Sequence, residues 1–279
     1  MWVDNRFPLQ FVTNGKQKIS YRSSQKLDNN KPLIILLHGI GSGSGSWAPM
    51  MSLLEKKYYT VAWDAPGYND STHLTKSSPQ SIDYSQVLSD FTKLLNLQPY
   101  AVIGHSLGAL MAVCYAVNHF PNLPKLILAN PANGYGSAKE EVRETKLTAR
   151  LSMLRELGIQ KMAIERSSAL LSPTASPEAL ALVEWNMNKV TKKGYEQAAR
   201  TLANGDIIGI GGKYKGEVHI ISSSGDNVTP ATTAKKIARS FEVSSLEILP
   251  GLGHASYVED ADIFAKSVLK FLENNLIDH

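Results

Sequence analysis

The sequence lacks the features that would place it outside ordinary globular proteins. Cys114 is the single cysteine among 279 residues, so no internal disulfide can form, and a reducing compartment is the simplest location. The longest apolar run in the first third, residues 33–37, is far shorter than the roughly 20 residues that a bilayer-spanning helix requires. Asp4, Arg6 and Pro8 interrupt the N-terminal segment where a signal peptide would be apolar. We therefore expect a cytoplasmic protein that is not embedded in a membrane.

A strong excess of charge of one sign is also lacking. The chain has 29 Lys and Arg against 25 Asp and Glu, a formal net charge of +4. Its lysine pairs, at 56–57, 192–193 and 235–236, lie far apart in the sequence. A charge this weak and scattered does not indicate a nucleic-acid partner. With 43% hydrophobic residues, the chain can bury a sizeable core, and its length allows a single large α/β domain.

Short apolar segments alternate with longer amphipathic ones, which is typical of a parallel sheet covered by helices. Residues 7–12 and 18–22, joined by a turn at Asn14-Gly15, predict an opening hairpin at the sheet edge. Six later strands are apolar on both faces, as central strands are. These strands are expected at residues 33–37, 60–63, 101–103, 126–128, 218–221 and 246–249, and helices at 47–57, 82–95, 107–120, 230–240 and 261–276. The predicted fold is α/β, with a mostly parallel central sheet of about eight strands.

One long region interrupts this alternation. Residues 138–203 contain helix-forming sequence but no convincing strand, with breaks near Gly158, Ser172-Pro173, Ser176-Pro177 and Gly194. We interpret residues 135–205 as an all-helical lid (cap) domain. Residues 1–134 and 206–279 would form the core domain into which it is inserted.

The strongest local signal is Gly104-His105-Ser106-Leu107-Gly108, directly after the strand at 101–103 and directly before an amphipathic helix. A serine at such a sharp turn is held in a strained backbone conformation with its hydroxyl exposed at the sheet edge. The flanking glycines are needed because side chains there would collide with the neighbouring strand and helix. Ser106 is therefore a candidate nucleophile, and a structural turn serine is the alternative.

A serine nucleophile requires a base, normally a histidine oriented by a carboxylate. His254 lies in a glycine-rich turn after the last predicted strand, and Asp226 follows the strand at 218–221. The residues between them allow one helix and one strand, which would bring both loops to the carboxyl ends of adjacent strands, where ligands bind. A helix N-cap for Asp226 and a buried structural role for His254 are the alternatives. The competing position for the acid, after the strand at 126–128, holds Asn130 and offers no carboxylate.

Attack on a carbonyl also requires donors for the oxyanion that forms, each contributing on the order of 3 kcal/mol. The loop His38-Gly39-Ile40-Gly41 follows the first long strand, and its glycines let backbone N–H groups approach a ligand. We assign the oxyanion hole to the N–H groups of Ile40 and Leu107.

The motifs follow one another along the chain in this order: His38-Gly39, Asp64-Ala65-Pro66-Gly67 with Ser71, the motif around Ser106, Asp226 and His254. Through these motifs, the sequence resembles the α/β-hydrolase fold superfamily over nearly the whole chain. Within it, the sequence is similar to the lid-bearing serine hydrolases, which include carboxylesterases, enol-lactonases and carbon–carbon bond hydrolases. The resemblance implies a Ser106, Asp226, His254 triad with no cofactor and no metal. The loop after His38-Gly39 is longer and more serine-rich than the common form, which leaves the second oxyanion donor open by about a residue.

Other side chains are candidates for contact with the substrate. We place His38, Gly39 and Trp185 in the substrate-binding set, with loop bracing by His38 and packing by Trp185 as alternatives. One arginine of the predicted lid could hold a substrate carboxylate, but helical spacing does not select among Arg143, Arg150, Arg155, Arg166 and Arg200.

The sequence thus predicts a serine hydrolase that cleaves a small carboxylic ester or lactone through an acyl-enzyme on Ser106. The first alternative is a carbon–carbon bond hydrolase acting on a vinylogous diketone from aromatic degradation. The second is a non-catalytic small-molecule receptor on the same fold. The expected partner is the small-molecule substrate, and the sequence does not determine the oligomeric state.

Overall fold

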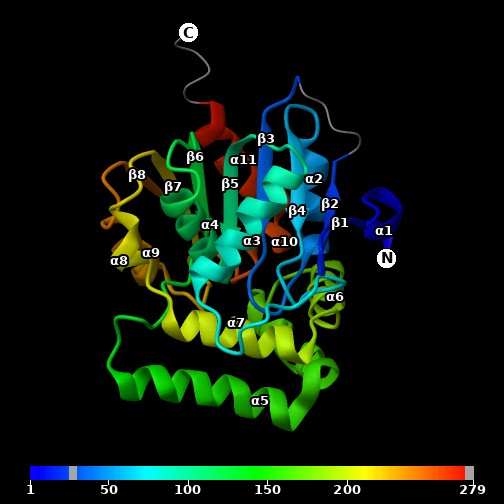
Figure 1. Ribbon diagram of the computed structural model, residues 1–279, viewed down its shortest axis with the longest axis vertical. Helices are drawn as coiled ribbons and strands as arrows, with labels where there is room; N and C mark the ends of the chain where they lie inside the picture. The colour runs from blue at the N-terminus through cyan, green and yellow to red at the C-terminus, as the bar shows by residue number, and fades with distance from the viewer. Residues whose placement is uncertain (25–29, 274–279) are drawn as a thin grey trace.

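A single sheet organises the computed structural model, which describes residues 1–24 and 30–273 (Figure 1). Its strand order is β1-β2-β4-β3-β5-β6-β7-β8. Strand β2 pairs antiparallel with β1 and with β4, and the other pairings are parallel. The mostly parallel, eight-stranded sheet predicted from the sequence is confirmed. The strands are β1 Gln10–Asn14, β2 Gln17–Ser23, β3 Leu33–Leu37, β4 Tyr59–Trp63, β5 Pro99–His105, β6 Lys125–Ala129, β7 Glu217–Ser223 and β8 Ser244–Leu249.

Helices cover both faces of this sheet. In Figure 1, α3 lies in front of the strands, and α2 and α11 lie behind them. Helix α4 packs against α3 on the front face, and α2 packs against α11 on the other. The helices outside residues 135–205 are α1 Trp2–Arg6, the 3₁₀-helix η1 Ser44–Trp47, α2 Ala48–Leu54, α3 Ser81–Leu94, α4 Leu107–Asn118, α8 Ile207–Gly211, α9 Ala231–Ala238, α10 Ser256–Glu259 and α11 Ala261–Glu273.

Strand β3 shows how an unbroken apolar run builds two cores. All five of its side chains are buried. Leu33, Ile35 and Leu37 belong to the core that includes α3 and α4. Ile34 and Leu36 belong to the core that includes α2 and α11. Successive side chains of a strand point to opposite faces, so a strand covered on both sides must be apolar throughout.

The chain between β6 and β7 contributes helices but no strand of the sheet, and all of its residues are described. Helices α5 and α7 lie across one end of the sheet (Figure 1). Helix α5 is bent at Gly158, whose φ of 67° is outside the helical region. We call residues 135–205 the helical segment. Its helices are α5 Glu140–Arg166, the 3₁₀-helix η2 Ser168–Leu170, α6 Pro177–Met187 and α7 Lys192–Asn204.

Two local expectations are wrong. Phe7, expected in the first strand, instead follows helix α1, because its side chain is buried in the core that includes α2 and α11 and its carbonyl oxygen accepts a hydrogen bond from the guanidinium of Arg22. Residues 246–249 lie in the edge strand β8, whose side chains are mostly exposed or half-buried, and not in a central strand. The break predicted near Gly194 is found at residues 188–191, between α6 and α7, and Gly194 itself lies in the first turn of α7, where its backbone touches that of Gly67. Of the helix predicted at 261–276, residues 274–276 lie outside the described residues.

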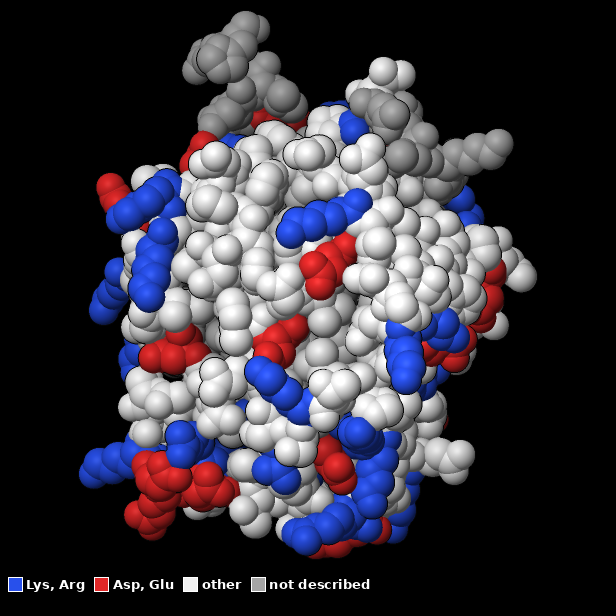
Figure 2. All heavy atoms as spheres, in the orientation of Figure 1, with Lys and Arg blue, Asp and Glu red and all other residues white. Residues whose placement is uncertain are grey.

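The surface agrees with the weak net charge. On the face shown in Figure 2, acidic and basic side chains are interspersed. Within the described ranges, none of the helices is both long and apolar enough to cross a membrane.

We predict that Gly108→Ala destabilises the fold strongly. A Cβ atom at this position would lie 2.4 Å from the carbonyl oxygen of Leu37 and 2.6 Å from that of His38, so helix α4 would have to move away from β3. We expect the free energy of unfolding, measured by urea denaturation, to fall by about 3 kcal/mol. Gly212→Ala is the matched control, because Gly212 has helical φ and ψ and its Cβ would approach nothing closer than 3.2 Å. Equal losses in the two variants would contradict this account.

Candidate active site

Ser106 occupies a strained turn between a strand and a helix. Strand β5 ends at His105 and α4 begins at Leu107, and Ser106 between them has φ 54° and ψ −114°. A positive φ is unfavourable for a residue with a side chain, and such strain concentrates at functional sites. The turn is held because the Ser106 N–H donates to the Ala129 carbonyl at 3.0 Å. It is also compact, since a Cβ at Gly104 would lie 2.4 Å from the Gly108 carbonyl oxygen.

The loop after β3 approaches this turn closely. A Cβ at Gly39 would lie 2.9 Å from the Cβ of Ser106, so only glycine allows this approach. His38 braces the loop, because its Nε2 accepts a hydrogen bond from the Ala65 N–H at 3.0 Å and its Nδ1 then donates to the Gly39 carbonyl at 2.9 Å. Burial lowers the pKa of His38 and favours this neutral form. Both ring nitrogens are therefore used within the protein.

Asp226 and His254 meet at the carboxyl ends of neighbouring parallel strands, β7 and β8. Helix α9 and strand β8 separate them in the chain, as the sequence predicted. The distance from Asp226 Oδ2 to His254 Nδ1 is 2.8 Å, and both side chains are buried. Because a carboxylate can only accept, His254 Nδ1 carries the proton of this hydrogen bond, and in the neutral imidazole Nε2 is then the acceptor.

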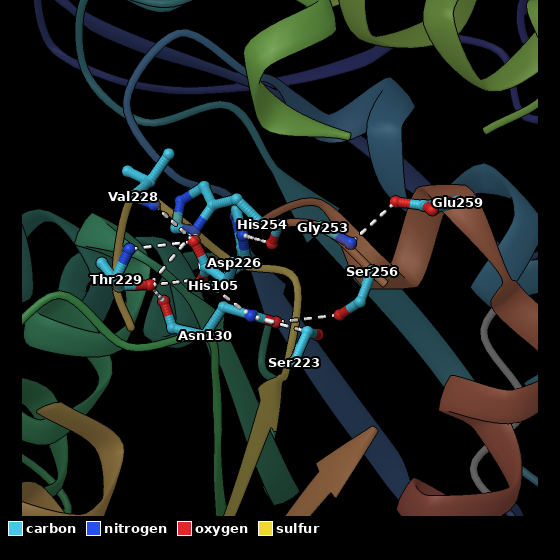
Figure 3. Close-up of polar contacts among 10 residues, drawn as sticks. All are labelled: His105, Asn130, Ser223, Asp226, Val228, Thr229, Gly253, His254, Ser256 and Glu259. Carbon is cyan, nitrogen blue, oxygen red and sulfur yellow. Dashed lines mark hydrogen bonds and ion pairs between the residues drawn. The ribbon is translucent and has the colours of Figure 1, made fainter. Parts of the chain in front are cut away.

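The Asp226 carboxylate accepts hydrogen bonds on both oxygens (Figure 3). Oδ1 accepts from the backbone N–H groups of Val228 at 2.7 Å and Thr229 at 2.9 Å. Oδ2 accepts from Asn130 Nδ2 at 2.9 Å, from Thr229 Oγ1 at 2.7 Å and from His254. Burial raises the pKa of Asp226, but the bonds from His254 and Thr229 outweigh it and hold the pKa below its ordinary value. One oxygen thus caps the local turn while the other meets the histidine.

Asn130, which the sequence marks only as a position without a carboxylate, lies beside Asp226 in the structure. Its Oδ1 accepts from Ser256 Oγ at 2.8 Å, and its backbone carbonyl lies 3.0 Å from Thr229 Oγ1 (Figure 3). A buried residue with φ of 41° is unusual, and Asn tolerates this conformation better than most residues. Its position directly after β6 was the available signal, because that places it at the same sheet edge.

His105 supports His254 from the other side. Its Nε2 donates to the backbone carbonyl of His254 at 2.9 Å, and the two ring centroids are 4.7 Å apart. Burial, together with the nearby His254, lowers the pKa of His105 to about 3. His105 is therefore a neutral donor near pH 7.

A cavity of about 340 Å³ opens beside these groups, and Ser106, His254 and Ile40 all line it. Its walls come from the loops after β3, β6, β7 and β8 and from α5, α6 and α7. The amides of Ile40 and Leu107 have no hydrogen-bond partner among the described residues, and the Leu107 amide lies at the N-terminus of α4. Unpaired amides at a helix N-terminus favour negative charge.

Three residues of the predicted substrate-binding set are not part of this lining. His38 and Gly39 lie behind it in the bracing contacts described above. Trp185 packs on η1, where a Cβ at Gly45 would lie 2.4 Å from its ring. The same ring has Lys189 Nζ 3.4 Å from its centroid.

The sheet, the strained serine turn and the acid–histidine pair define the α/β-hydrolase class. The family model described as alpha/beta hydrolase fold matches residues 32–261, and the chain belongs to this family. RutD of Escherichia coli O26:H11, provisionally named a carbamate hydrolase, is 25% identical over 88% of this chain and 92% of that protein.

Solved structures share the fold. The enol-lactonase from Burkholderia xenovorans LB400 has a TM-score of 0.83 at 22% identity, covering 94% of this chain and 99% of that one. An esterase from Thermogutta terrifontis, with malate bound, has a TM-score of 0.82 at 17% identity, covering 95% and 98%. At these identities the likeness concerns the fold.

We predict that His105 makes stability depend on pH. With its pKa lowered to about 3 in the folded state, His105 takes up a proton on unfolding once the pH is below about 6.5. The unfolded state then binds more protons than the folded state. The free energy of unfolding therefore decreases as the pH is lowered, and this group contributes up to about 1.4 kcal/mol per pH unit.

His105→Gln keeps an N–H donor for the His254 carbonyl but does not titrate. Urea denaturation between about pH 7 and pH 4 should show a shallower loss of stability in this variant than in the wild type. His73→Gln, a change at an exposed histidine, is the control. Identical slopes for wild type and His105→Gln would rule out this contribution.

Proposed function

We propose that this protein is a serine hydrolase that cleaves a small carboxylic ester or lactone through an acyl-enzyme on Ser106. Hydrolase activity is supported by the family and by the hydrolases it resembles. The observation that carries the finer proposal is the 2.8 Å contact between Asp226 and His254 at the cavity that Ser106 also lines.

In this mechanism, Ser106 Oγ attacks the carbonyl carbon while His254 Nε2 takes its proton. Asp226 holds the proton on Nδ1 and stabilises the imidazolium that forms. The tetrahedral oxyanion accepts hydrogen bonds from the amides of Ile40 and Leu107. Collapse expels the alcohol with the proton from His254. Water then attacks the acyl-enzyme, with His254 as the base. His254 returns the proton to Ser106 Oγ as the carboxylic acid product is released.

The helical segment would act as the lid of this site. Arg150 of α5, Val183 of α6 and Leu202 of α7 all line the cavity that Ser106 lines. Closing a site against water strengthens the electrostatic interactions inside it. This supports residues 135–205 as a lid domain on a core of residues 1–134 and 206–279.

Substitution of Ser106 tests the proposal directly. We expect Ser106→Ala to lower kcat for a short-chain 4-nitrophenyl ester at least ~10,000-fold and to abolish labelling by a fluorophosphonate probe. Ser42→Ala, at another serine of the cavity lining, is the matched control and should keep the labelling. Labelling that maps to another residue, or ester turnover that survives in Ser106→Ala, would refute the nucleophile.

A panel of substrates separates the alternatives. A carbamate belongs in it because of the relative named for that activity. A vinylogous diketone cleaved faster than esters would favour carbon–carbon hydrolysis, and tight ligand binding without turnover would favour a receptor.

Thr229 is expected to support the acid. Its hydroxyl lies 2.7 Å from Asp226 Oδ2 and 3.1 Å from His254 Nδ1. Thr229→Val leaves these groups without that partner, and we expect kcat/KM to fall about tenfold while Thr229→Ser restores it. Ester hydrolysis by the two variants, with thermal melting to verify folding, is the measurement. Full activity in Thr229→Val would contradict the role.

A further inference from the structure

The cavity beside Ser106 is cationic on its walls. Arg150 and Lys236 line it, and no Asp or Glu occurs among its described lining residues. A second cavity, of about 460 Å³, shares part of this lining and adds Lys146 and Arg166, again with no Asp or Glu among the described residues that line it. Among the residues that the structure describes, the two linings together contain four cations and no carboxylate.

Arg150 is the cation that joins the two spaces. It lines both cavities and is half-buried, whereas Lys146, Arg166 and Lys236 are exposed. Its guanidinium carbon lies 5.6 Å from the centroid of the Tyr135 ring. Its Nη1 donates to the backbone carbonyl of Lys146 at 3.1 Å, which restricts the side chain but uses only part of its donor capacity.

Arg150 has no carboxylate partner among the described residues, although another arginine of the same helix forms ion pairs with glutamates. Arg143, two turns earlier on α5, forms an ion pair with Glu140. Arg150, Arg166 and Tyr195 all line the second cavity. A half-buried guanidinium with free donors binds a planar carboxylate through two parallel hydrogen bonds better than any neutral group.

We propose that the substrate carries a carboxylate in addition to the carbonyl attacked by Ser106, and that Arg150 binds this carboxylate. The inference rests on the proposed function. It narrows the substrate class to monoesters of dicarboxylic acids and other substrates whose acyl group also carries a carboxylate. The exposed cations at the rim then raise the local concentration of such anions. Arg150 is a binding residue in this account and takes no part in the proton transfers at Ser106.

Two esters of matched length test the proposal on the full chain. In 4-nitrophenyl glutarate monoester the acyl group ends in a carboxylate, and in 4-nitrophenyl pentanoate it ends in a methyl group. We expect the wild type to prefer the anionic ester, and Arg150→Gln to lower the ratio of kcat/KM, anionic over neutral, at least ~tenfold, with most of the change in KM. Arg150→Lys should fall between the two, because an ammonium retains the charge but not the planar pair of donors.

Arg155→Gln is the matched control. Arg155 is on the same helix, donates to Ser152 Oγ at 2.9 Å, and lines neither cavity, so the ratio should not change. Thermal melting verifies that each variant folds. Free glutarate should compete with the anionic ester in the wild type and much less in Arg150→Gln. Stronger competition by inorganic phosphate than by glutarate would assign the site to a phosphate group and overturn the carboxylate class.

The failures of the two proposals are distinguishable. Turnover that depends on Ser106 but shows no preference for the anionic ester, or an equal ratio in wild type and Arg150→Gln, overturns the carboxylate site and leaves the serine hydrolase intact. If neither ester is cleaved, calorimetric titration of glutarate into wild type and Arg150→Gln still decides the carboxylate site. Equal binding by the two proteins, or no binding by the wild type, would refute it.

Discussion

The buried carboxylate of Asp226 is the constraint on which the rest of the site depends. An ionised carboxyl group removed from water is stable only if its oxygens are supplied with hydrogen-bond donors. Here the donors come from Asn130 after β6, from the turn after β7 and from His254 after β8. Satisfying one charge therefore fixes three loops relative to one another. The Asn130 amide extends this link through Ser256 to the helix that follows His254.

The loop that carries His254 is also tied to the helices above the cavity. The Gly253 N–H donates to Glu259 Oε2 at 2.9 Å, and the Ser172 N–H donates to the same oxygen at 3.0 Å. The Ala255 N–H donates to the Leu170 carbonyl at 2.8 Å. A Cβ at Gly253 would lie 2.5 Å from the Leu171 backbone, so the glycine permits this contact. The segment between α5 and α6 is thus fastened on either side of the proposed base.

Burial gives the histidines of the site different tasks. His38 and His105 are kept neutral and brace the loops around Ser106, because His38 uses both ring nitrogens and His105 uses its Nε2 in hydrogen bonds with backbone groups. His254 instead has a carboxylate on one nitrogen and the cavity beside it. Residue type alone does not separate these tasks, because all three histidines lie in or beside glycine-containing turns of similar composition.

The amino-acid sequence by itself determined the order of elements and the turns after the strands, since hydrophobic periodicity and glycine placement are local properties. It therefore predicted the sheet and the adjacency of Asp226 and His254. The partners of the site were decided only by tertiary structure: Asn130 reaches Asp226 across 96 positions of the chain, and Arg150 reaches the cavity because α5 folds back over the sheet. Such contacts depend on how distant elements pack. A local sequence pattern does not determine whether the polar face of a helix contacts solvent or lines a cavity.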